Sequence, residues 1–92
     1  LYQKMLDVQP SEIRVMELHH RWASCSENGA LNFHWKCMMA PITIIDYIVV
    51  HELAHLIQPR HTDAFWNVVD KILPDYRERK EWLKQHGAEM DL

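Results

Sequence analysis

The sequence predicts an α+β fold in which a small antiparallel β-hairpin packs on a long central helix that is followed by two further helices. Three observations lead to this prediction. Residues 13–22 suit a pleated strand, a long apolar periodic segment follows Pro41, and prolines divide the C-terminal part into separate helical segments. The 92 residues are enough for one domain, so we expect residues 1–92 to form a single unit.

The N-terminal half is expected to hold one short helix and the hairpin. A polar helix over residues 2–8 would end before Pro10, because proline cannot continue a helix. Residues 13–22 alternate in character, which predicts a strand. Residues 24–29 contain Ser, Glu, Asn and Gly, which favour a reversing turn, so a second strand over 30–35 would complete the hairpin.

The C-terminal half is expected to form three helices. Pro41 suits the first position of the central helix because its φ is already helical, and Pro59 ends that segment. Apolar residues at three- and four-residue spacings predict one buried stripe: Ile44, Ile45, Ile48, Val49, Leu53 and Leu56. Thr62 is the expected N-cap of the next helix, which Pro74 ends, and Gly87 would cap a last helix over 75–86.

Composition excludes several classes of protein. Hydrophobic residues make up 48% and charged residues 25%, which argues against a disordered or coiled-coil chain. Ten Lys and Arg are scattered among 13 Asp and Glu, so no basic surface for nucleic acid is evident. The longest apolar runs are far short of the ~20 residues of a membrane span. Without a signal peptide, and with only Cys25 and Cys37, the chain is expected to be cytoplasmic.

Histidine carries the functional signal. The predicted central helix contains H-E-L-A-H, with His51 and His55 one helical turn apart, so both imidazoles project from the same face. His61 follows beyond Pro59, where the chain has left the helix and can turn back. Three imidazoles leave a fourth coordination position open to water, as in catalytic zinc sites, so the pattern predicts that His51, His55 and His61 bind Zn²⁺. Ordinary core or surface histidines would explain neither the third histidine nor the intervening glutamate.

Glu52 is rotated by about 100° from His51 on the helix, which keeps its carboxylate near the site without making it a natural ligand. The sequence therefore predicts hydrolysis. Zinc would lower the pKa of water to about 7, and Glu52 would act as general base and then pass the proton to the leaving group. Zinc is the default metal for three histidines, although imidazoles also accept Co, Ni, Cu and Fe.

Two alternatives stay open. The same chemistry would serve a nucleotide phosphoanhydride hydrolase, but only Arg60 stands next to a predicted ligand. A non-catalytic, zinc-stabilised binding module would have no use for Glu52. Other residues are interpreted more simply. The four tryptophans and the two cysteines are expected to be packing residues, and the histidines of the hairpin region are left without a role: His19, His20 and His34.

The sequence resembles the YgjP-like metallopeptidase domain, which is related to the SprT-like and WLM zincins. R-W-A-S-C at residues 21–25 is similar to the R-W-G-S-C of that family, with Ala23 in place of glycine. The match continues with L-N at residues 31–32 and through residues 40–56, 59–66 and 74–83. A metzincin is excluded because Gln58 stands where metzincins use glycine, and no Met-turn can be identified.

This resemblance implies a zincin-like fold, zinc bound by His51, His55 and His61, and Glu52 as the catalytic residue. It implies a peptide or protein substrate, which the strand over 13–20 could hold by main-chain pairing if it borders the cleft. Members of the family carry more chain before the matching part, so we expect this sequence to be the C-terminal catalytic core of a longer protein. The oligomeric state is left open.

Overall fold

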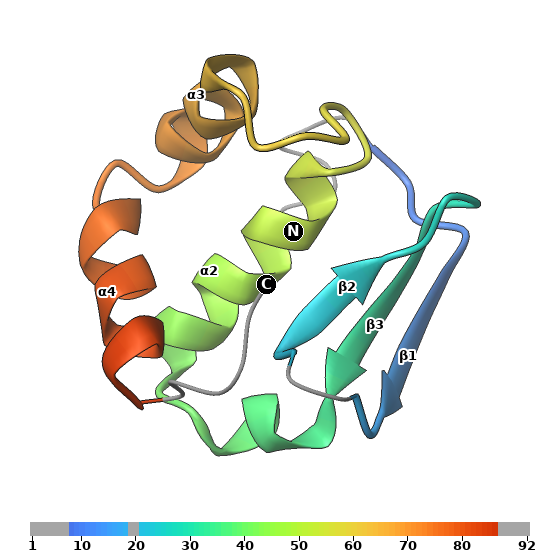
Figure 1. Ribbon diagram of the computed structural model, residues 1–92, viewed down its shortest axis with the longest axis horizontal. Coiled ribbons are helices and arrows are strands. Elements are labelled where there is room, and N and C mark those ends of the chain that lie inside the picture. The colour runs from blue at the N-terminus through green and yellow to red at the C-terminus, as the bar shows by residue number, and fades with distance from the viewer. Residues whose placement is uncertain (1–7, 19–20, 87–92) are drawn as a thin grey trace.

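The computed structural model of the protein describes residues 8–18 and 21–86 and has the α+β fold that the sequence predicts. A three-stranded sheet lies beside a central helix, and two further helices lie on the other side of that helix (Figure 1). The elements follow in the order β1 (Glu12–Met16), β2 (Ala23–Cys25), β3 (Ala30–His34), the short 3₁₀ helix η1 (Trp35–Met39), α2 (Ile42–Ala54), α3 (Asp63–Ile72) and α4 (Tyr76–His86).

The sheet is mixed, and the prediction of one strand over 13–22 is wrong. The strand order is β1-β3-β2, with β2 antiparallel and β1 parallel to β3. The chain leaves β1 after Met16 and crosses to the other edge of the sheet before β2 begins at Ala23. Only β2 and β3 form the predicted hairpin. A parallel pair needs such a crossover, which a local pattern of strand-forming residues does not reveal.

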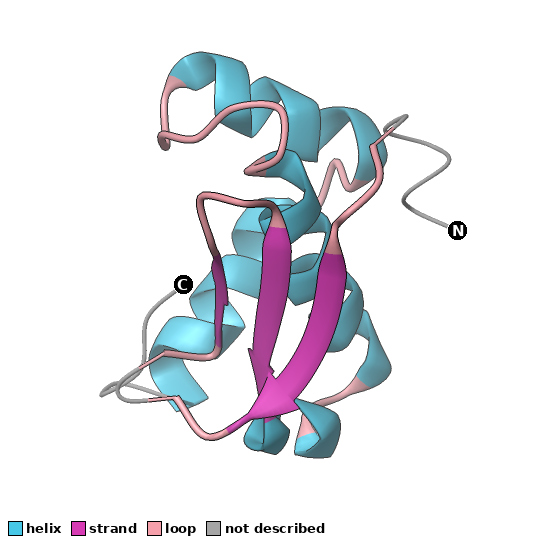
Figure 2. Cartoon of the chain, turned by 90° about the vertical axis from the view of Figure 1, so that its right-hand side faces the viewer, coloured by secondary structure: helices cyan, strands magenta, loops and turns pink. Residues whose placement is uncertain are grey.

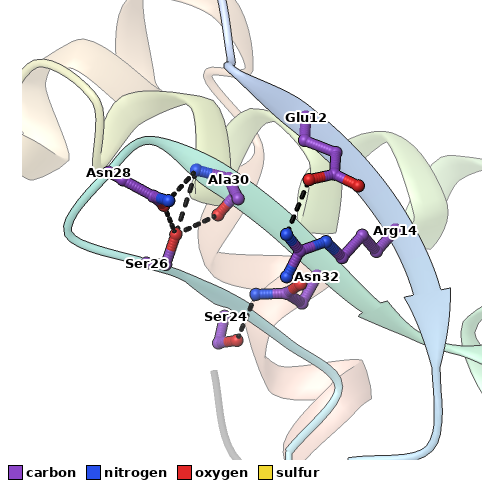
Figure 3. Close-up of polar contacts among 7 residues, drawn as sticks. All are labelled: Glu12, Arg14, Ser24, Ser26, Asn28, Ala30 and Asn32. Atoms are coloured by element: carbon purple, nitrogen blue, oxygen red, sulfur yellow. Dashed lines mark hydrogen bonds and ion pairs between the residues drawn. The ribbon is translucent and has the colours of Figure 1, made fainter.

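The turn between β2 and β3 has the chemistry that the sequence indicates. The Ser26 hydroxyl contacts the side chain of Asn28 and accepts a hydrogen bond from the backbone N–H of Ala30 at 3.0 Å (Figure 3). Gly29 has a φ of +85°, a conformation that side chains with a Cβ rarely adopt. Its N–H donates to the Ser26 carbonyl at 3.0 Å, so the turn is closed by backbone and side-chain hydrogen bonds together.

The sheet has one polar and one apolar face, as alternation along a strand requires. Figure 3 shows the polar contacts between Arg14 and Glu12 and between Asn32 and Ser24. The intervening side chains of β2 and β3 belong to the hydrophobic core or pack against it: Ala23, Cys25, Leu31 and Phe33. Figure 2 shows helices behind this sheet. Ala23 pairs with Phe33 in this extended register, so the position where the family has glycine requires no special backbone conformation.

Helix α2 is the centre of the fold. The predicted single stripe is too narrow, because side chains on several sides of α2 are buried: Ile44, Tyr47, Ile48, Val50, His51, Glu52, Leu53 and Ala54. Contacts with β2, α3 and α4 explain this burial, since α2 is packed between the sheet and the C-terminal helices. The helix ends at Ala54 with His55 as C-cap, and turns continue the chain toward Pro59.

The two C-terminal helices match their predicted positions closely. Thr62 caps α3, because its hydroxyl accepts a hydrogen bond from the Phe65 N–H at 3.4 Å. Arg79 joins α4 to the start of α2 by donating from its guanidinium to the Thr43 carbonyl at 2.9 Å. The predicted helix over 2–8 falls largely, and the Gly87 cap entirely, outside the described residues.

Apolar side chains also reach the surface. A groove of about 260 Å³ lies between the sheet and α2, and its lining includes Ile13, Val15, Phe33, Ile48 and Val49. Trp35 is 46% exposed, so the expectation that it is a packing residue is wrong. No helix in the described part of the chain combines the length and apolar character needed to cross a bilayer.

Candidate metal centre

The three histidines of the sequence pattern converge. His51 lies in the last turn of α2, His55 is its C-cap, and His61 belongs to the loop that leads to α3. The Nε2 atom of His61 is 3.1 Å from Nε2 of His51 and 3.0 Å from Nε2 of His55. We refer to these side chains as the three-histidine cluster. Within residues 8–18 and 21–86, these three side chains could hold one metal ion, because one ligand atom of each lies within 4.8 Å of the others.

The spacing and chemistry of the cluster fit a divalent metal ion. Zn–N bonds of 2.0–2.1 Å at tetrahedral angles separate the two nitrogens of a ligand pair by about 3.3 Å. The observed separations of 3.0 and 3.1 Å are close to this value. Three imidazole nitrogens suit zinc and several other transition metals. The role of these histidines as ligands stays a prediction, but nothing in their arrangement opposes it.

Neighbouring groups orient the imidazoles. Nδ1 of His55 is 3.3 Å from the Gln58 carbonyl, which can only accept, so Nδ1 carries the proton and the lone pair of Nε2 faces the cluster. Nδ1 of His51 is 3.3 Å from the hydroxyl of the buried Tyr47. Second contacts of this kind fix the tautomer and the ring orientation of metal-binding histidines.

Burial favours the uncharged form of His51 and His55. It lowers the pKa of His51 to about 2, and the neighbouring imidazoles and Lys80 contribute to the same direction. The pKa of His55 is also lowered, first by burial and then by His61. A neutral imidazole is the form that binds a metal, so the environment favours ligation at neutral pH.

Glu52 is buried beside the cluster. Its side chain is 1% exposed, and Oε2 lies 4.0 Å from Nε2 of His51 with no hydrogen-bond partner. Burial raises the pKa of Glu52 to about 8, while the charge of Arg21 acts in the opposite direction. An unpartnered buried carboxyl oxygen is costly for a fold. Its position is therefore explained better by chemistry at the cluster than by packing.

Comparison with known proteins identifies the family of the chain and a similar fold. The model of a family described as "YgjP-like, metallopeptidase domain" matches residues 1–86. The chain belongs to this family. Among solved structures, the YgjP-like chain is similar to the crystal structure of the metallopeptidase zymogen of Pyrococcus abyssi abylysin, with a TM-score of 0.86 and 23% identity. That alignment covers 98% of this chain and 91% of the other, and the likeness concerns the fold. No curated protein matches the chain.

Phe65 packs against all three rings of the cluster in this YgjP-like domain. Its ring is fully buried, and its centre is 5.0 Å from that of His51, 4.5 Å from that of His55 and 4.9 Å from that of His61. Phe65 lies in the helix that the sequence predicts after Thr62, but no motif of the sequence distinguishes it from other apolar residues. Phe65 lies in the first turn of α3, whereas His61 lies in the loop before the Thr62 cap. The contact of Phe65 with all three rings therefore depends on the path of the loop that joins α2 to α3.

Trp66 and β2 form further boundaries of the site in the YgjP-like domain. Trp66 was expected to be a packing residue, but its ring also stacks on His61 at 5.7 Å. The strand next to α2 is β2, and β1 lies at the opposite edge with β3 between them. β1 (Glu12–Met16) is therefore separated from β2 by β3, and the pairing of a substrate with residues 13–20 stays a hypothesis. Both cysteines are free thiols, of which Cys37 is buried and Cys25 half-buried. The side chain of His34 accepts a hydrogen bond from the Lys36 N–H at 3.0 Å. His19 and His20 lie outside the described residues.

Proposed function

We propose that the protein is a zinc-dependent peptidase in which His51, His55 and His61 hold the metal and Glu52 is the general base. One observation carries the proposal: Nε2 of His61 lies 3.0–3.1 Å from the Nε2 atoms of His51 and His55, beside the buried Glu52, whose Oε2 has no hydrogen-bond partner. Membership of a metallopeptidase domain family supports peptide bonds as the target. A peptidase acting on proteins or peptides in the cytoplasm is the form of the proposal that the sequence favours.

Each side chain of the site has a separate task. The metal, when bound, supplies a Lewis acid that activates water and stabilises negative charge on a carbonyl oxygen. Glu52 Oε2 takes the proton of the attacking water and then delivers it to the nitrogen of the leaving amine. Tyr47 and the Gln58 carbonyl keep the imidazoles oriented through their Nδ1 atoms. Phe65 shields the rings from water on the buried side.

The outer edge of β2 is the place where we propose that an extended substrate lies. In this proposal β2 has the role in substrate pairing that the sequence suggests for residues 13–20. β2 is an edge strand, so its outer main-chain groups are not paired within the sheet. Pairing of a peptide with such an edge uses backbone groups that every peptide has, and side-chain pockets then supply selectivity.

Metal analysis combined with an activity screen tests the proposal. We expect the purified protein to bind one zinc ion and to cleave casein or unstructured peptides, and not nucleoside triphosphates. His61→Ala should lose stoichiometric metal, whereas His86→Ala, which changes an exposed histidine on α4, should keep metal and activity. Glu52→Gln should keep the metal and reduce kcat/KM by about 100-fold or more.

Three outcomes would contradict the proposal. Full metal content in His61→Ala would remove His61 from the ligand set. Unchanged turnover in Glu52→Gln would remove the general base. Hydrolysis of triphosphates in preference to peptides would support a phosphoanhydride hydrolase instead.

A further inference from the structure

Lys80 of α4 is held next to the three-histidine cluster by an aromatic surface. Its Nζ atom is 4.4 Å from the centre of the Trp66 ring. That ring lies 5.7 Å from the rings of both His51 and His61. Trp66 also stacks on the buried Tyr76 at an interplanar angle of 15°. The ammonium group therefore lies no more than about 10 Å from the ring centres of His51 and His61.

The charge of Lys80 is not neutralised within the described chain. Over residues 8–18 and 21–86, no carboxylate lies within ion-pair distance of it, whereas the neighbouring Arg79 pairs with Asp75 at 3.1 Å. An aromatic ring attracts an ammonium group through its quadrupole but does not cancel its charge. The protein as a whole carries a net charge of -3, so this local positive charge is not a general property of its surface.

A second exposed cation lies next to another element that packs on α2. Lys80 belongs to α4, and Arg21 lies two residues before the start of β2; both α4 and β2 contact α2. Both residues are exposed, so their charges face solvent. Positive charge is therefore present on α4 and just before β2, two elements that pack on α2.

We propose that Lys80, supported by Trp66, binds a carboxylate of the substrate and makes the protein select acidic peptides. This inference rests on the proposed peptidase function and adds the substrate class to it. The carboxylate belongs either to a Glu or Asp side chain near the bond that is cut or to the C-terminus of a short peptide. Both present the same chemistry to an ammonium group.

The expected preference is modest but measurable. An ion pair near a protein surface is weakened by water and salt, so we expect a Glu-containing peptide to be cleaved up to about fivefold faster than its Gln twin. Reversing the charge at position 80 should invert the ratio of the two cleavage rates. The preference should also shrink as the salt concentration rises, because mobile ions screen exposed charges.

Matched peptide pairs test the inference. We propose to measure kcat/KM of the zinc-loaded protein for quenched peptides that differ only by Glu or Gln at successive positions, and for free-acid and amide forms of one short peptide. Lys80→Gln should remove the preference, Lys80→Glu should invert it and Lys80→Arg should retain it. Lys84→Glu, one helical turn further along α4, changes the net charge equally and should leave the ratio unaltered.

A binding assay separates this inference from the peptidase proposal. Glu52→Gln protein, loaded with zinc, is titrated with the same Glu and Gln peptides carrying an uncharged dye. Suppose that the wild type cleaves no peptide, whereas the Glu52→Gln protein binds the Glu peptide more tightly than the Gln peptide and loses this difference when Lys80 is replaced. The peptidase proposal then fails, and the carboxylate site stands. Equal affinity and equal kcat/KM for both peptides, failure of the acidic peptide to bind, or an equal loss of preference in Lys84→Glu would overturn the inference.

Discussion

Replacing Glu52 by Gln should stabilise the metal-free protein while it impairs catalysis. Glu52 is fully buried, and its Oε2 has no hydrogen-bond partner. Burial raises its pKa from the ordinary 4.5 to about 8. The folded protein therefore holds a protonated carboxyl at neutral pH, whereas the unfolded chain holds an ionised one. Glutamine has nearly the same shape and no charge to desolvate, so it escapes this cost.

The sign and size follow from proton linkage. A raised pKa gives a contribution to stability that is complete below pH 4.5 and is lost as the pH rises toward about 8. Each pH unit in this window costs the wild type about 1.4 kcal/mol. At pH 7 the wild type has therefore lost about 3 kcal/mol relative to Glu52→Gln, and the two proteins should be equally stable near pH 4.5.

Urea unfolding of both proteins in the presence of EDTA measures this difference at pH 5, 6, 7 and 8. The effects of His51 and His55 are common to the two proteins and cancel in the comparison. Adding zinc should reduce the difference in unfolding free energy between the two proteins, because a nearby cation favours the ionised carboxylate. The reasoning is refuted if the difference in unfolding free energy does not change with pH, or if Glu52→Gln is the less stable protein at pH 7.

Two further predictions concern the support of the cluster. Tyr47→Phe removes the hydroxyl 3.3 Å from Nδ1 of His51 and should weaken zinc binding by about 10-fold or more, as measured by competition with a zinc chelator; unchanged affinity would show that this contact does not orient the ring. Thr62→Ala removes the cap of α3 and should cost about 1 kcal/mol in urea unfolding, whereas Thr62→Ser should cost less, and equal costs would argue against the cap.

Local patterns in the sequence were enough to locate the helices and the convergence of the histidines. His51 and His55 share a face because helix geometry alone places them one turn apart. Thr62 could be identified as a cap because that role depends on a hydrogen bond three residues away. The turn ending at Gly29 was recognisable for the same reason, since its residues close on one another.

Features that depend on distant parts of the chain were not predictable. The crossover from β1 to β2 is set by which strand pairs with β3, and residues 13–22 taken alone fit one continuous strand. The burial of α2 on several sides arises because the sheet and two helices pack on it. Likewise, no spacing in the sequence indicates that Lys80 reaches Trp66 across the gap between α3 and α4.

The position of α2 at the centre of the fold limits how this protein can evolve. Consecutive residues of one helix supply both the hydrophobic interior, through Val50 and Leu53, and the reactive groups, through His51 and Glu52. A substitution that improves one set changes the backbone on which the other depends. New specificities should therefore arise more readily on α4 and the edge of β2, where variation leaves the shared scaffold intact.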